Sequence, residues 1–193
     1  MNIKKRVTLL LAALLVSGCA TLPVSQYTVE TYSLDPEITR ELAKIKGLRY
    51  GIAVSKFTLS EDSDIALYCS NQHPITLPGG QSFVAYVHSA LVEQLTAAGM
   101  TSSIEAADVA LSGKLKTFKP LWQQDAWLIA FELSTNRGNE TMRPTDIYSF
   151  TNANNVTHSE NDCKRAAQAV MPAVQKMIMT IASSWHFKNN LLM

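Results

Sequence analysis

The most reactive side chains of the chain are three cysteines, Cys19, Cys69 and Cys163. A thiol can be acylated, oxidised to a disulfide or used as a nucleophile, and its surroundings decide which. Cys19 ends a segment in which a basic head at residues 4–6 precedes a ten-residue stretch, 7–16, that is apolar except for Thr8. That stretch is too short to cross a bilayer, which needs about 20 apolar residues. The segment therefore predicts a secretory signal over residues 1–18, with a thiol directly after it.

The residues around Cys19 indicate how its thiol is used. Val16-Ser17-Gly18-Cys19 resembles the bacterial lipobox. In signals of that kind the cysteine receives a diacylglycerol, the chain is cut before it (here between Gly18 and Cys19), and the new amine is usually acylated. Two or more acyl chains hold a protein stably on a membrane. The alternative is a plain secretory peptide with a chance cysteine. By resemblance to lipoprotein sorting rules, Ala20 favours the outer membrane, with the protein facing the periplasm.

Cys69 and Cys163 remain after the predicted anchor. The periplasm is oxidising, so an even pair of cysteines there is read first as a disulfide. It would close a loop of about 95 residues and stabilise the fold by several kcal/mol. One alternative is a nucleophilic Cys69 served by the nearby His73, although no acid or amide that would orient the imidazole is evident. Two buried free thiols are the other alternative.

The sequence predicts neither a metal site nor a cofactor. The histidines are widely spaced and form no metal-binding motif with each other or with cysteine: His73, His88, His158 and His186. Asp62 and Asp64 lie two residues apart but lack the further acidic partners of a calcium loop. Neither a G-x-S-x-G motif nor a phosphate-binding loop occurs.

A basic and aromatic group is the best candidate for a contact surface. Lys114 and Lys116 alternate on the outer face of a predicted strand, Lys119 lies just beyond, and Trp122 follows in a loop. Three positive charges suit anionic lipid head groups or an acidic partner, and an exposed tryptophan is a common contact residue. A solvated sheet face, with Trp122 as a core anchor, is the alternative.

Length and composition describe one globular domain. The chain has 193 residues, of which 47% are hydrophobic and 17% are charged, with a formal net charge of +1. Removal of the signal leaves 14 basic and 16 acidic side chains, so the mature chain carries about −2. This balance gives no reason to expect a nucleic-acid partner. The predicted organisation is a signal peptide at 1–18, a tether at 19–34 and a single domain at 35–193.

Hydrophobic periodicity outlines the domain. Alternation predicts strands at residues 50–58, 109–118, 126–134 and 141–151, and helical spacing predicts helices at 81–98 and 160–185. A short helix begins at Asp35-Pro36, residues 60–80 read as a long polar loop, and residues 136–139 form a hairpin turn. Strands grouped between two helices predict an α+β fold. The expected sheet is mostly antiparallel, with four to five strands and two main helices on one face.

Several of these segments together resemble small outer-membrane lipoproteins of bacteria. The resemblance is carried by residues 77–99, by the strand Ala107-Asp-Val-Ala-Leu-Ser-Gly-Lys-Leu-Lys-Thr-Phe118, by the strand with Trp127 and by Cys163 at the start of the last helix. The broader set includes the lipoprotein partners of transport and envelope-assembly machines. The resemblance implies a non-enzymatic accessory protein that binds the membrane through its acyl chains and contacts an envelope protein or lipid. A periplasmic hydrolase and a structural lipoprotein without a specific ligand are the alternatives.

Overall fold

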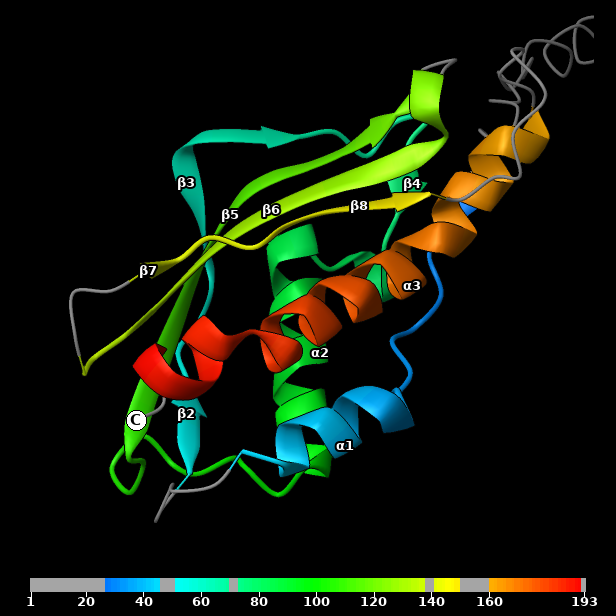
Figure 1. Ribbon diagram of the computed structural model, residues 1–193. Helices are drawn as coiled ribbons and strands as arrows, with labels where there is room; N and C mark the ends of the chain where they lie inside the picture. The colour runs from blue at the N-terminus through cyan, green and yellow to red at the C-terminus, as the bar shows by residue number, and fades with distance from the viewer. Residues whose placement is uncertain (1–26, 46–50, 70–72, 138–140, 150–159, 192–193) are drawn as a thin grey trace, which may run out of the picture.

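The computed structural model describes residues 27–45, 51–69, 73–137, 141–149 and 160–191. Its elements in chain order are β1 (Tyr27–Thr28), α1 (Pro36–Ala43), β2 (Ile52–Val54), β3 (Thr58–Ile65), β4 (Ile75–Thr76), η1 (Pro78–Gly80), α2 (Phe83–Ala97), β5 (Val109–Leu121), η2 (Trp122–Gln124), β6 (Ala126–Thr135), β7 (Thr141–Met142), β8 (Thr145–Ser149), α3 (Glu160–Ser183) and the short π-helix η3 (Phe187–Leu191) (Figure 1). None of the helices in these ranges combines the length and apolarity that crossing a membrane requires. Gly18 and Cys19 lie outside the described residues.

The main sheet is built around the long strand β5. On one side β2 and then β3 run parallel to it, and on the other side β6 runs antiparallel. The strands β7 and β8 pair antiparallel with β6. The fold is therefore α+β, but the sheet has six strands of mixed orientation, so the prediction of four to five mostly antiparallel strands is wrong. The parallel pairs follow from α2, because a helix between β3 and β5 returns the chain in the same direction.

The predicted polar loop at residues 60–80 contains strands. Most of β3 lies there, and β4 pairs parallel with β1 in a second, two-stranded sheet. Within the described residues β3 pairs with β5 alone, which places it at the edge of the main sheet. Acidic residues such as Asp62 and Asp64 are compatible with an edge strand, where charge discourages pairing with another chain. Their polarity hid the strand from an argument based on alternation.

A β-bulge at Lys116 changes which side chains of β5 face the core. Leu115 pairs with Phe131 and Thr117 pairs with Ala130, so Lys116 is the extra residue. Uninterrupted alternation predicts that Phe118 lies on the same face as the lysines. The bulge shifts the phase by one residue, and Phe118 is instead fully buried.

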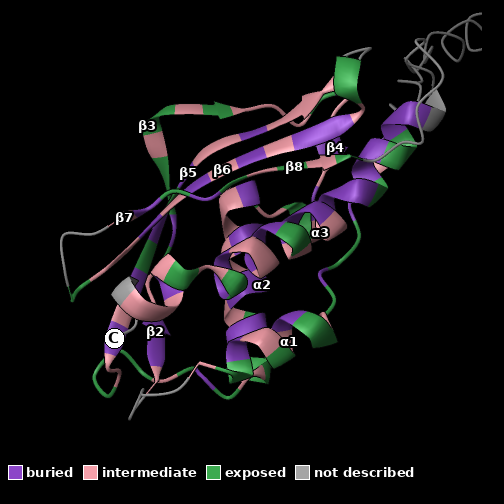
Figure 2. Cartoon of the chain, viewed as in Figure 1, coloured by how far each residue is buried: buried purple, intermediate pink, exposed green. Residues whose placement is uncertain are grey.

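The core is centred on a stack of aromatic rings between the helices and the sheet. Phe83 of α2 stacks on Phe118 of β5 with ring centroids 3.5 Å apart, and Phe118 stacks on Trp127 of β6 at 4.6 Å. The indole Nε1 of Trp127 donates a hydrogen bond to the carbonyl oxygen of Ala166 in α3 at 2.9 Å. The stack therefore connects both long helices with the two central strands. Figure 2 shows buried positions alternating with more exposed ones along β5 and β6.

The described part of the predicted tether, residues 27–34, packs onto the domain. Val29 and Tyr32 are buried. Gln175 of α3 donates a side-chain hydrogen bond to the carbonyl oxygen of Ser33 at 2.9 Å. The packed domain thus includes Tyr27 and does not begin at residue 35.

A buried amide holds this N-terminal segment and α1 against α2. The side chain of Gln94 is fully buried. Its Oε1 accepts hydrogen bonds from the hydroxyl of Tyr32 at 2.9 Å and from the backbone N–H of Asp35 at 3.1 Å. Its Nε2 donates to the Asp35 carbonyl oxygen at 2.8 Å and to the Thr39 hydroxyl at 2.6 Å. Asp35 also caps α1, because its Oδ1 accepts from the backbone N–H of Glu37 at 2.7 Å.

Replacing Gln94 with leucine should lower the free energy of unfolding by about 2–4 kcal/mol, measured by urea denaturation. Leucine has a similar size but leaves several buried donors and acceptors unpaired, and each costs about 1–3 kcal/mol. Gln168→Leu is the matched control, because Gln168 is exposed on α3 and should change stability by no more than about 0.5 kcal/mol. Equal losses in the two variants would contradict the role given to Gln94.

Candidate functional site

The structure brings the two predicted disulfide partners together. Cys69 lies between β3 and β4, Cys163 lies in the first turns of α3, and both are buried, at 4% and 2% exposure. The two thiols are side-chain hydrogen-bond partners, although 94 positions separate them in the chain. Both thiols are free in the structure, which is the alternative of two buried free thiols, and the disulfide stays a prediction that their proximity supports.

The surroundings of Cys69 do not suit a nucleophile. Burial, followed by the hydrogen bond with Cys163, raises the pKa of the Cys69 thiol well above its usual range. Reactive cysteines require the opposite shift, because the thiolate is the nucleophile. His73 is connected to Cys69 through its backbone, since the Cys69 N–H donates to the His73 carbonyl oxygen at 2.8 Å. The ring of His73 packs edge-on against Tyr27, with centroids 6.3 Å apart.

Ion pairs neutralise much of the predicted basic surface. The ammonium group of Lys116 lies 3.7 Å from a carboxylate oxygen of Asp62 and 3.8 Å from one of Glu132. Lys119 forms an ion pair with Asp64. Lys114 is exposed and has no ion-pair partner among the described residues. All three carboxylates come from the strands β3 and β6 that flank β5, so the surface presents mixed charge.

Trp122 lies at the end of β5, in η2. It is partly buried and packs against the hydrophobic core. The structure therefore supports the alternative for this residue, a core anchor, here for the β5–β6 connection. Part of its surface remains accessible to solvent.

The described histidines are dispersed. In the ranges that the structure describes, no three or more His, Cys, Asp or Glu side chains converge as a metal site would require. His73 contacts Tyr27, His88 contacts Phe57 and His186 follows α3, whereas His158 lies outside the described residues.

A cavity that the sequence did not reveal lies between α2 and the chain that connects β2 with β3. Its volume is about 350 Å³, within the range of small-ligand pockets. Apolar walls come from Phe57, Leu59 and Val84, and polar groups come from Lys56, Ser82 and His88. None of the described residues that line it carries a carboxylate.

A glycine makes room for Phe57 beside this cavity. Phe57 is 2% exposed, and its ring lies 4.9 Å from that of Phe131. A Cβ atom at Gly113 would lie 2.8 Å from Cδ1 of Phe57 and 2.5 Å from Cε1 of Phe131. The Phe57 ring also meets His88 edge-on, at a centroid distance of 5.1 Å. Gly113 therefore allows Phe57 to lie against the sheet, where it supports the ring of His88.

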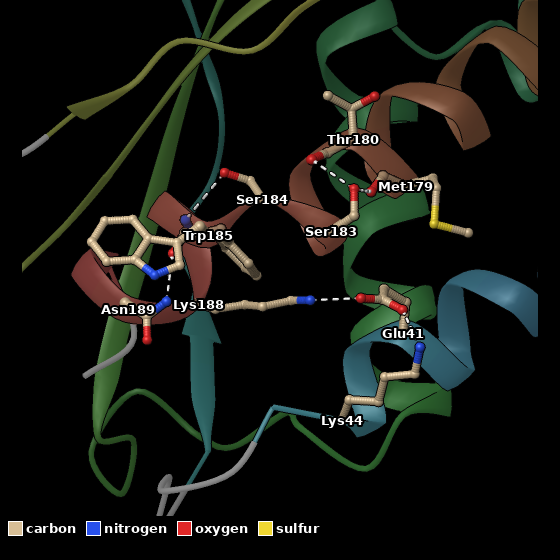
Figure 3. A network of polar contacts seen from close by, with 10 residues as sticks. Glu41, Lys44, Met179, Thr180, Ser183, Ser184, Trp185, Lys188 and Asn189 are labelled. Atoms are coloured by element: carbon tan, nitrogen blue, oxygen red, sulfur yellow. Dashed lines mark hydrogen bonds and ion pairs between the residues drawn. The ribbon is translucent and has the colours of Figure 1, made fainter.

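A polar network just beyond the C-terminal end of α3 fixes the C-terminal segment (Figure 3). Lys188, one residue after the fully buried Phe187, extends to α1, where its Nζ lies 2.5 Å from Oε1 of Glu41. Lys44 lies 2.5 Å from the other carboxylate oxygen. The hydrogen bond from Lys188, together with that from Lys44, lowers the pKa of Glu41 to about 2.

The stability of the protein should therefore fall between about pH 4.5 and pH 2. In this window the unfolded chain protonates Glu41 while the folded chain keeps it ionised, so the stabilisation is full above the unfolded pKa and is lost as the pH falls to the folded pKa. Glu41→Gln removes this contribution, so its free energy of unfolding should depend less steeply on pH than that of the wild type. Glu37→Gln is the control, because Glu37 and its partner Arg40 are both more than 70% exposed. Identical pH slopes for Glu41→Gln and the wild type would contradict the pairing.

Comparison with known proteins finds a solved structure with a similar fold. No family model matches the chain, and no curated protein matches its sequence. The crystal structure of protein XCC0632 from Xanthomonas campestris, described by the family model DUF330, matches with a TM-score of 0.52 at 10% sequence identity. The match covers 84% of this chain and 95% of that chain. At this identity the likeness shows that the two proteins share a fold.

Proposed function

We propose that the protein is a bacterial lipoprotein, anchored through Cys19 to the outer membrane and facing the periplasm. In this proposal it acts as a non-enzymatic binding or accessory component in envelope transport or assembly. The observation that carries the proposal is the lipobox-like Val16-Ser17-Gly18-Cys19 after a basic head and a short apolar stretch. Cleavage before Cys19 leaves an acylated cysteine as the first residue of the mature chain.

The short distance along the chain between Cys19 and the packed domain supports a position close to the membrane. The first described residue, Tyr27, is eight positions after Cys19, and eight extended residues reach at most about 29 Å. Tyr27 borders the first half of α3 near Lys164. This end of the domain would lie near the lipid, and Figure 1 places the C-terminal end at the opposite side of the molecule.

Lys114, Lys116, Lys119 and Trp122 are the proposed contact surface for an envelope partner. Because Lys116 and Lys119 already have acidic partners, the surface suits a partner of mixed charge better than a polyanion. Lys114 is the residue free to pair with an acidic group of that partner.

Cys19→Ala tests the anchor. The variant should leave the membrane fraction of cells, because it lacks the acyl chains that hold the protein there. Cys69→Ala is the control and should remain with the membranes. A Cys19→Ala variant that still sediments with washed membranes would overturn the lipoprotein proposal.

Crosslinking in living cells, followed by purification and mass spectrometry, tests the accessory role. One stoichiometric envelope protein would support the role and identify the pathway. The crosslink should weaken in Lys114→Glu, while the amount of membrane-bound protein stays unchanged. Recovery of the lipoprotein alone under conditions that crosslink a known envelope complex would overturn this part of the proposal.

A further inference from the structure

We propose that the cavity between α2 and residues 56–59 binds an amphiphile that carries one anionic group, a carboxylate or a phosphate, on an apolar body. The cavity adjoins the contact surface on the sheet, because Thr58, one of its lining residues, pairs with Lys114 of β5. The proposal rests on the shape of the cavity, its apolar walls and the charge of its rim.

The walls select an apolar body. Phe57 and Val84 line the cavity, and Leu59, at its mouth, is 53% exposed although it is a large aliphatic side chain. Exposed apolar surface that continues into a hollow is typical of a ligand site. An apolar chain or ring in this position would remove that surface from water.

The polar groups select an anion. Lys56 is exposed, and among the described residues no carboxylate pairs with it. Ser82 caps α2 by accepting a hydrogen bond from the Ala85 N–H at 3.2 Å. The N–H groups of Phe83 and Val84, in the first turn, still lack an intrahelical acceptor. A cation and a helix N-terminus thus border one cavity whose described lining has no acidic residue, and both favour negative charge.

His88 forms part of the cavity wall on α2. It lines the cavity one helical turn beyond Val84. Its Nε2 atom is shielded from solvent and has no hydrogen-bond partner among the described residues. Buried polar atoms are seldom left without partners, but less than 1 Å² of this nitrogen is accessible, so a ligand in the cavity would meet the rest of the ring and not this atom.

Photolabelling of the lipidated protein in nanodiscs tests the proposal. The probe is dodecanoate with a diazirine near its methyl end, and the labelled peptides are mapped by mass spectrometry. The label should concentrate on the peptides that contain Phe57–Leu59 and Val84–Ser89. Dodecanoate or dodecyl phosphate should compete with the probe, and the stronger competitor identifies the head group as carboxylate or phosphate. Dodecyltrimethylammonium should compete at least tenfold less well.

Two variants connect the label to the cavity. Lys56→Glu should reduce labelling by about tenfold or more, because it replaces a charge-assisted contact with repulsion. Lys164→Glu makes the same change of charge at an exposed position of α3 that does not line the cavity, and it should label like the wild type. Ala85→Trp, which fills the cavity from α2, should also reduce the label. Labelling spread evenly over the chain, equal competition by the cationic amphiphile, or equal labelling of Lys56→Glu and Lys164→Glu would each overturn the proposal.

Discussion

Trp127→Ala is expected to lower the free energy of unfolding by about 3–5 kcal/mol, the usual cost of removing a buried aromatic side chain. Trp127 is fully buried in the stack that joins β5 and β6 to the long helices. Alanine would leave a cavity against Phe118 and would remove the donor to the Ala166 carbonyl oxygen. Because the stack connects both helices with the sheet, no single element can move to fill the space without losing contacts elsewhere.

The measurement is urea denaturation followed by far-ultraviolet circular dichroism. Trp185→Ala is the matched control, since Trp185 is 69% exposed and its loss should change stability by no more than about 0.5 kcal/mol. Trp127→Phe keeps an aromatic ring in the stack but lacks the indole N–H, so it should fall between the two. A loss below about 1 kcal/mol for Trp127→Ala would show that the stack does not hold the layers together.

The helices could be predicted closely because their local signals agree with their packing. The helix predicted at 81–98 is α2, Phe83–Ala97, where Ser82 caps the start and Gly99 adopts a φ of 70° just beyond the end. The helix predicted at 160–185 is α3, Glu160–Ser183. Asp35 caps α1 as the Asp-Pro pair suggests. In α1 and α2 a capping residue and a hydrophobic stripe give the same boundaries.

The sheet was less predictable, because its strands are defined by distant partners. The polar sequence of β3 has no alternation of its own and becomes a strand through pairing with β5. The bulge at Lys116 depends on the register with β6 and leaves no mark in the composition of β5. Local patterns cannot show either feature, since both arise from hydrogen bonds between strands that are far apart in the chain.

The candidate sites likewise divide into features that local sequence predicts and features that depend on distant partners. The cysteine pair could be proposed from count and compartment alone, whereas the partners of Lys116 and Lys119 lie on other strands. The cavity beside α2 is assembled from Lys56, Phe57 and His88, which come from two separate segments. A glycine inside a strand, here Gly113, is the one local signal that could have pointed to it, because such a glycine often marks the close approach of another group.

Oxidation of Cys69 and Cys163 to a disulfide should raise the free energy of unfolding by about 2–5 kcal/mol, the range found for native disulfides in secreted domains. The bridge would join the segment before β4 to the first turns of α3. It would therefore restrict the unfolded chain across about 95 residues, which include α2, β5 and β6. Wild type oxidised with glutathione should be more stable than a Cys69→Ala/Cys163→Ala double variant by this amount, and the two should become similar in reductant.

The buried position of the two thiols also predicts when the bond forms. Thiol–disulfide exchange needs a thiolate, and burial raises the pKa of Cys69 in the folded protein. Reduced, folded protein should therefore oxidise slowly, whereas chain that refolds in oxidised glutathione should acquire the bridge before α3 packs. Mass-based thiol trapping at intervals during each reaction would separate the two rates. Rapid oxidation of the folded protein would mean that the Cys69 segment opens readily, and two free thiols in protein isolated from cells would exclude the bridge.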